Sequence, residues 1–252
     1  MEVLKVENLG QRYGGLEVLF DLSFILERGE KVALIGPNGA GKTTVLNVLS
    51  GFIPPAAGRI TLLNQDITDM PSYKRVSLGL ARSFQLNTLF PSLNLLTNVL
   101  LAIQGVQTIR YHWFRSITGY KDNLATAREL LEMVDLWKEN DSPVSALGYG
   151  QQRLVEIILA LASKPKLLFL DEPSAGLSSG ESSHLIEMIN SLTKDTTVFF
   201  CAHDLDLVFS LADRVMVLYY GKIIAQGTPE EIQDDSKVRE IYLGIEKEPG
   251  DA

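Results

Sequence analysis

The sequence predicts an α/β fold in which a parallel β-sheet is covered by helices on both faces and a helical segment is inserted. Three observations support this prediction. Short apolar runs with strand character alternate with helical segments, which is typical of parallel sheets. The first apolar run of the alternating part leads into a glycine-rich loop that opens a helix. Finally, residues 89–163 contain few strand signals and read as largely helical.

The N-terminal part is expected to be rich in β-structure. Residues 1–30 have the pattern of short strands and turns, because 18–26 is rich in β-formers and 28–30 resembles a hairpin turn. The further elements expected here are a strand over 31–35, a helix over 43–49 that stops near Gly51, and a strand over 59–63.

The middle of the chain predicts helices, and strands return after it. Apolar residues at Leu124, Ala127, Leu131 and Val134 have the spacing of one helix face, so we expect a helix over 123–137. The remaining expected elements are a helix over 151–163, a strand over 167–170, a helix over 181–192, strands over 197–202 and 215–219, and a polar tail over 246–252.

Composition narrows the classes of function. The chain has 252 residues, of which 46% are hydrophobic, enough to form a sizeable core. A net charge of −8 disfavours a nucleic-acid binder. The single cysteine, Cys201, excludes an internal disulfide and lies in an apolar run that predicts burial. We expect no transmembrane helix and no signal peptide, because no 18-residue window is continuously apolar and the N-terminus lacks a basic region.

The strongest motif is the run Gly36-Pro37-Asn38-Gly39-Ala40-Gly41-Lys42-Thr43-Thr44, which satisfies the pattern G-x-x-x-x-G-K-[ST]. Glycines let backbone N–H groups curl around phosphate oxygens, and the following helix directs its positive end at the same anion. Lys42 is expected to reach the β- and γ-phosphates of ATP, and Thr43 to ligate Mg²⁺. A chance match is the alternative, but the expected strand and helix on either side of the loop argue against it.

A second candidate site follows the apolar strand at 167–170, where Asp171 and Glu172 stand together. A carboxylate at the end of a buried strand is costly without a partner, and Mg²⁺ shared with Thr43 would supply one. We therefore expect Asp171 to serve the metal and Glu172 to orient or deprotonate the attacking water. The alternative is that both acids simply cap a strand in a solvated turn.

Further motifs make the sequence similar to a known family. The segment Leu147-Gly148-Tyr149-Gly150-Gln151-Gln152-Arg153 resembles the L-S-G-G-Q signature of ABC ATPases, at the family's position just before the Asp-Glu strand. Other elements match in order. They are Tyr13, resembling the residue that stacks on adenine; Gln85, resembling the loop glutamine that senses the γ-phosphate and metal; the loop Ser174-Ala175-Gly176-Leu177 at the dimer interface; and the switch histidine, His203.

The resemblance implies a P-loop NTPase (RecA-like) parallel-sheet core with an antiparallel β subdomain and an inserted helical subdomain. Its parts would be core residues 1–88 and 164–235, helical subdomain 89–163 and C-terminal extension 236–252. It also implies ATP and Mg²⁺ as cofactors, and a head-to-tail dimer with a second ATP-binding subunit, either a copy or a paralogue. Gly148, Gly150 and Gln151 of one chain would then contact the γ-phosphate bound to the other, with Glu172, His203, Lys42 and Gln85 catalytic.

Within this superfamily, the sequence most resembles the ATP-binding subunits of branched-chain amino-acid importers (the LivG type), and related urea and short-amide importers share much of the pattern. The segments that carry this likeness are 13–16, 82–85, 149–153 and 172–177. The resemblance implies two separate membrane permeases, an indirect extracytoplasmic solute-binding protein and a location on the cytoplasmic face of the plasma membrane. Two departures stand out: Gly148 replaces the usual signature serine, and Ser178 stands where many members carry an acid.

Two other functions remain open on the sequence alone. One is a soluble ABC ATPase of DNA repair or translation, which the compact length and acidic balance disfavour. The other is a weakly hydrolysing nucleotide-gated module, which Gly148 keeps open. In the middle segment, Trp113 and Phe114 are interpreted as packing residues, with a docking surface for membrane subunits as the alternative.

Overall fold

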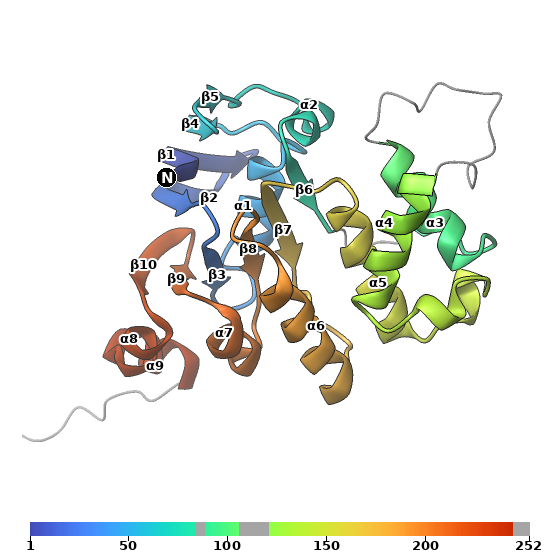
Figure 1. The fold of residues 1–252 in the computed structure, drawn as a ribbon. Helices are drawn as coiled ribbons and strands as arrows, with labels where there is room; N and C mark the ends of the chain where they lie inside the picture. The colour runs from blue at the N-terminus through green and yellow to red at the C-terminus, as the bar shows by residue number, and fades with distance from the viewer. Residues whose placement is uncertain (84–88, 106–120, 244–252) are drawn as a thin grey trace, which may run out of the picture.

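The computed structural model describes residues 1–83, 89–105 and 121–243, which form two β-sheets and a set of helices (Figure 1). The strands are β1 (Glu2–Tyr13), β2 (Leu16–Glu27), β3 (Lys31–Ile35), β4 (Ala57–Leu62), β5 (Gln65–Asp66), β6 (Leu80–Arg82), β7 (Leu167–Asp171), β8 (Thr197–Cys201), β9 (Arg214–Tyr219) and β10 (Lys222–Gly227). The helices are α1 (Lys42–Leu49), α2 (Ser72–Ser77), α3 (Leu95–Gly105), α4 (Lys121–Glu132), η3 (Trp137–Glu139), η4 (Val144–Ala146), α5 (Tyr149–Leu161), α6 (Ser179–Ser191), α7 (Leu205–Leu211), α8 (Pro229–Asp234) and α9 (Ser236–Leu243).

The predicted parallel sheet is confirmed. Its strand order is β10-β9-β3-β8-β7-β6, and β6, β7, β8, β3 and β9 run parallel to one another, with β10 antiparallel at one edge. The second sheet is antiparallel, with the order β2-β1-β4-β5. Figure 1 places it on the side of the molecule away from α3 and α4.

Both faces of the parallel sheet are buried, which explains why its strands read as continuous apolar runs. Alternate side chains such as Phe169 and Phe199 pack into a core shared with α1 and the antiparallel sheet. Their neighbours, such as Leu170 and Phe200, pack into a second core formed with α5, α6 and α7.

The expected hairpin at residues 28–30 is wrong. The strands on either side of it, β2 and β3, lie in different sheets, so this turn carries the chain from the antiparallel to the parallel sheet. Gly29 has φ +75°, and its Cα lies so close to the carbonyl of Lys194 that a Cβ would clash with it. Its N–H donates to Thr197 Oγ1 at 3.0 Å, which anchors the turn to β8 instead.

The helix expected over 123–137 ends earlier, at Glu132, because Asp135 has φ +56° and Leu136 starts a separate turn. Strands β6 and β10 were not expected, since β6 has only three residues and β10 alternates exposed and half-buried positions instead of forming an apolar run. None of the helices in the described ranges is long and apolar enough to cross a membrane.

Candidate functional site

The carboxyl ends of three parallel strands bring the candidate residues to one edge of the sheet. Strand β3 leads into the glycine-rich loop, β7 ends at Asp171, and β8 ends two residues before His203. The strands are adjacent and in register, because Cys201 pairs with both Leu34 and Asp171. Ligands of open α/β sheets bind outside this edge, so the fold places the two sequence-predicted motifs in one site.

The glycine-rich loop has backbone angles that depend on its glycines. Gly39 and Gly41 have φ of +81° and +108°, a region that side chains rarely adopt. Nothing lies within 4 Å of the position of a Cβ on Gly39, so this face of the loop is open. The other face is supported, because Gly221 N–H donates to Ala40 O at 3.0 Å. Gly36 approaches the Leu218 carbonyl so closely that a Cβ would clash.

Helix α1 starts directly from the loop with Lys42. The Lys42 ammonium is buried and donates to the loop carbonyls of Gly36, at 2.7 Å, and Pro37, at 3.2 Å. Thr43 is exposed and Thr44 half-buried at the first turn of the helix. A phosphate held by the loop would therefore find one cation and the open N-terminus of a helix at its side.

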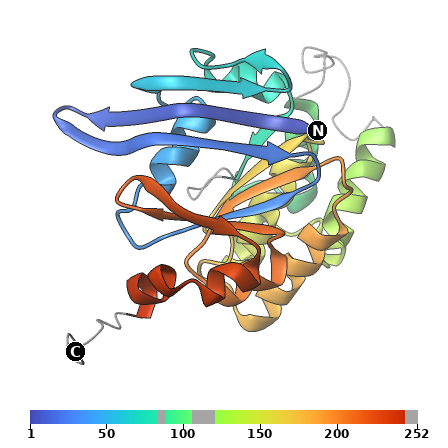
Figure 2. The ribbon, with the colours of Figure 1, turned by 90° about the vertical axis from the view of Figure 1, so that its left-hand side faces the viewer.

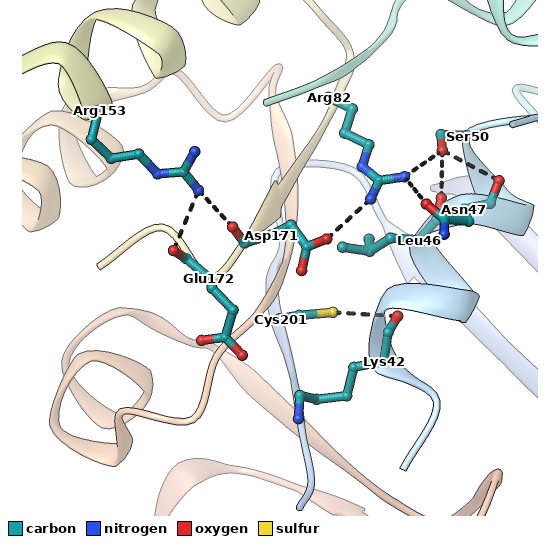
Figure 3. A network of polar contacts seen from close by, with 9 residues as sticks. All are labelled: Lys42, Leu46, Asn47, Ser50, Arg82, Arg153, Asp171, Glu172 and Cys201. Atoms are coloured by element: carbon teal, nitrogen blue, oxygen red, sulfur yellow. Dashed lines mark hydrogen bonds and ion pairs between the residues drawn. The ribbon is translucent and has the colours of Figure 1, made fainter. Parts of the chain in front are cut away.

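Asp171 is almost fully buried at the end of β7, with its side chain 3% exposed (Figure 3). Its Oδ2 accepts from the guanidinium of Arg82 at 3.0 Å. Its Oδ1 is buried and has no hydrogen-bond partner within the described part of the chain. Such an orphaned carboxylate oxygen fits a Mg²⁺ site, because this ion prefers hard oxygen ligands and retains several waters.

Glu172 lies next to the expected switch histidine. The Glu172 backbone has φ +48°, and its N–H donates to Cys201 O at 2.9 Å, which aims the side chain away from the sheet. Its Oε2 is 2.5 Å from His203 Nδ1. The Glu172 side chain is 18% exposed and that of His203 64%, so the pair stands at the surface of the sheet edge. A carboxylate held by a histidine in this way is a suitable base for a water molecule.

Arg153 of α5 donates hydrogen bonds to the backbone carbonyls of Asp171 and Glu172, a role that the sequence analysis missed. Its NH2 group donates to Asp171 O at 2.6 Å and to Glu172 O at 3.3 Å (Figure 3). Its NH1 group pairs with Glu156 at 2.8 Å. A buried charge that binds main-chain carbonyls leaves no pattern in the sequence beyond a polar residue on an apolar helix face.

The signature segment begins α5 and contacts the loop that follows Glu172. Gly148 is the N-cap, and its N–H donates to Gln151 Oε1 at 3.0 Å, so this N–H already has a partner within the chain. Gly150 is buried, and a Cβ there would clash with the Glu181 carboxylate. The exposed Tyr149 ring lies against Gly176, where a Cβ would come within 2.5 Å of Tyr149 Cε1.

Tyr13 ends β1 at the tip of the β1–β2 hairpin and is 48% exposed. Figure 2 shows this hairpin extending beyond the parallel sheet, and Leu19 of β2 packs against Gly41 of the phosphate loop. Tyr13 therefore lies on the hairpin that borders the loop. Gln85, Trp113 and Phe114 lie outside the described residues.

Cys201 is fully buried, as expected, and its Sγ is 3.8 Å from Lys42 O. Burial, followed by the charge of Asp171, raises the pKa of the Cys201 thiol well above its usual value. The thiol therefore stays protonated and acts as a packing group between β8 and α1.

Comparisons with known proteins agree on one family. Residues 19–175 match the ABC transporter family, and residues 222–248 match the branched-chain amino acid ATP-binding cassette transporter family. The chain is 37% identical to the high-affinity branched-chain amino acid transport ATP-binding protein LivG of Salmonella typhimurium, over 96% of this chain and 98% of the relative. It is 36% identical to the corresponding protein BraF of Pseudomonas aeruginosa, with the same coverage.

Among solved structures, it resembles an ATP-binding cassette of an ABC transporter in its ADP conformation. The TM-score is 0.84 at 30% identity, over 97% of this chain and 99% of the other.

Proposed function

The chain belongs to the ABC transporter ATP-binding family, and from this premise we propose that it powers uptake of branched-chain amino acids through separate membrane permeases. It is an ATP-binding, ATP-hydrolysing transporter subunit. One observation supports the ATP hydrolysis on which this proposal depends. The phosphate loop, Asp171 and the Glu172–His203 pair lie together at one edge of the sheet.

The residues at this edge of the sheet have separate roles in ATP binding and hydrolysis. Lys42 and the backbone N–H groups of residues 38–44 hold the phosphates. Glu172 takes a proton from water while His203 orients its carboxylate. Thr43 and Asp171 would hold Mg²⁺, which supplies neutralisation of the phosphate charge when it is bound. Tyr13 stacks on the adenine and Gln85 senses the γ-phosphate.

The signature residues act on a second ATP-binding subunit. Gly148, Gly150 and Gln151 stand at the N-terminus of α5, where the helix dipole favours an anion. In the head-to-tail dimer that the family resemblance implies, the signature of one chain reaches the nucleotide bound to the other. The interface loop 174–177 lies against Tyr149 of the same chain, so the two contact regions are neighbours on the surface.

The permeases have a suitable surface to dock on. A cavity of about 460 Å³ is lined by Phe90 and Leu101 of the helical part, and it shares Arg82 with an adjoining cavity of about 250 Å³ near Phe52 and Tyr73. Phe52, Tyr73 and Phe90 are at least half exposed. Contiguous exposed apolar groups mark an interaction surface, and an amphipathic helix of a permease is the occupant that we propose.

The solute is assigned from the relatives. Several of them carry branched-chain amino acid transport in their names, and the match over residues 222–248 points to the same group. The chain then works at the cytoplasmic face of the plasma membrane, with a solute-binding protein on the other side. Urea and short amides are the competing solutes.

The test is solute uptake by vesicles that contain the subunit with its partner ATP-binding subunit and permeases, with the solute-binding protein outside. Wild type should take up leucine with ATP inside, and Glu172→Gln should lower ATP turnover by about 10²- to 10⁴-fold while ATP binding persists. If wild type turns over ATP no faster than Glu172→Gln, the chain is a nucleotide-gated module and not a motor. Uptake of urea in preference to leucine would overturn the solute assignment alone.

A further inference from the structure

Arg82 occupies a position between the metal-site carboxylate and the helix that carries the phosphate loop. Its NH2 group pairs with Asp171 Oδ2 at 3.0 Å. Its NH1 group donates to Asn47 Oδ1 at 2.8 Å and Ser50 Oγ at 2.9 Å, both at the end of α1 or next to it (Figure 3). The guanidinium also lies 5.6 Å from the centre of the Phe52 ring. These contacts hold the guanidinium in one orientation.

The pair of charges is withdrawn from water. The side chain of Arg82 is 8% exposed and that of Asp171 is 3% exposed. A buried carboxylate that loses the cation it is paired with is strongly destabilised, so the ion pair with Arg82 balances Asp171 while no metal ion is bound. The Lys42 ammonium does not pair with Asp171, because it donates to the Gly36 and Pro37 carbonyls.

The two carboxylate oxygens of Asp171 have different surroundings. Oδ2 faces Arg82, whereas Oδ1 is buried without a hydrogen-bond partner among the described residues. The guanidinium that holds Oδ2 is itself tied to α1 through its NH1 group, so the plane of the carboxylate is fixed relative to this helix. The free oxygen is thus presented in a fixed direction.

We propose that Arg82 is a positioning residue that holds Asp171 by one oxygen, presents the other to Mg²⁺, and weakens the attraction of this carboxylate for the metal. Arg82 and Mg²⁺ are then two cations that share one buried carboxylate. By linkage, each reduces the gain in free energy that the other obtains from it. The inference rests on the proposed role of Asp171 toward Mg²⁺.

The experiment measures binding of a non-hydrolysable ATP analogue to the full chain, once with EDTA and once with Mg²⁺. The dissociation constant with EDTA divided by that with Mg²⁺ reports how much the metal contributes to binding of the analogue. In Arg82→Gln, this ratio should rise at least tenfold above that of wild type, because Mg²⁺ now relieves an unbalanced charge. In Arg82→Lys, which retains the charge, the ratio should stay within about threefold of wild type while turnover falls through loss of the fork.

Arg75→Gln is the matched control. Arg75 of α2 is also a buried arginine whose guanidinium reaches the end of α1, but it donates to main-chain carbonyls there, those of Val48 and Leu49, and not to Asp171. Its substitution should destabilise the chain without changing the ratio.

An equal ratio in Arg82→Gln and Arg75→Gln, or the same rise in Arg82→Lys as in Arg82→Gln, would overturn the inference and leave the proposed function standing. A wild type whose analogue binding is independent of Mg²⁺ would instead remove the metal role of Asp171 itself, and the inference with it.

Discussion

Replacement of Arg153 by methionine tests how the catalytic carboxylate is held. The Arg153 side chain is 5% exposed and that of its partner Glu156 is 9% exposed, so Arg153→Met leaves a buried charge without its cation. Loss of one member of a buried pair costs about 3–5 kcal/mol of unfolding free energy. The substitution also removes the hydrogen bonds to the Asp171 and Glu172 carbonyls.

The double variant Arg153→Met/Glu156→Leu separates these two effects. It has no unbalanced charge, so urea denaturation should recover most of the lost stability, since a buried ion pair replaced by apolar residues is often neutral. ATP turnover should remain low in both variants, because the Asp171 and Glu172 carbonyls no longer accept hydrogen bonds from Arg153 and the position of the Glu172 side chain is no longer fixed.

Two results would refute this reasoning. If the double variant is as unstable as Arg153→Met, the cost does not come from the unbalanced Glu156 carboxylate. If the double variant regains wild-type turnover, the contacts of Arg153 with the Asp171 and Glu172 carbonyls do not position the base.

Three further predictions concern the signature and the fold. Gly148→Ser should raise ATP turnover up to about tenfold in a steady-state assay, since it offers a charge-assisted hydrogen bond to the γ-phosphate; an unchanged rate would mean that the serine is dispensable. Gly176→Ala should lower turnover and the thermal midpoint, because φ is +77° and the Tyr149 ring occupies the place of a Cβ; a rate and midpoint equal to wild type would show that the loop adapts. Burial acts to raise the pKa of Glu30, but its hydrogen bonds and ion pair with Arg214 outweigh this and hold the pKa below 4.5. Its contribution to stability is therefore present above pH 4.5 and is lost as the pH falls through the lowered pKa, and Glu30→Gln should flatten the acid branch of a stability–pH curve.

The errors in the sequence-based predictions have physical causes. The turn at 28–30 has the composition of a hairpin, but composition does not say which strand pairs with the next one. Gly29 is required by the approach of the Lys194 carbonyl, a contact between segments far apart in the chain. The helix over 123–137 was extended too far because the apolar spacing continues through Val134 after the backbone has already turned at Asp135.

What the sequence determined by itself is the chemistry that short segments carry. The phosphate loop, the strand that ends at Asp171 and the signature helix are local, since a few neighbouring residues dictate their backbone and the anion or metal that they suit. The pairing of charged groups across the sheet depends on the tertiary structure. Arg82 reaches Asp171 because β6 and β7 pair in parallel, and Arg153 reaches the Glu172 backbone because α5 packs on β7. Partners that are distant in the chain leave no spacing to recognise, and burial makes their pairing obligatory only once the fold has formed.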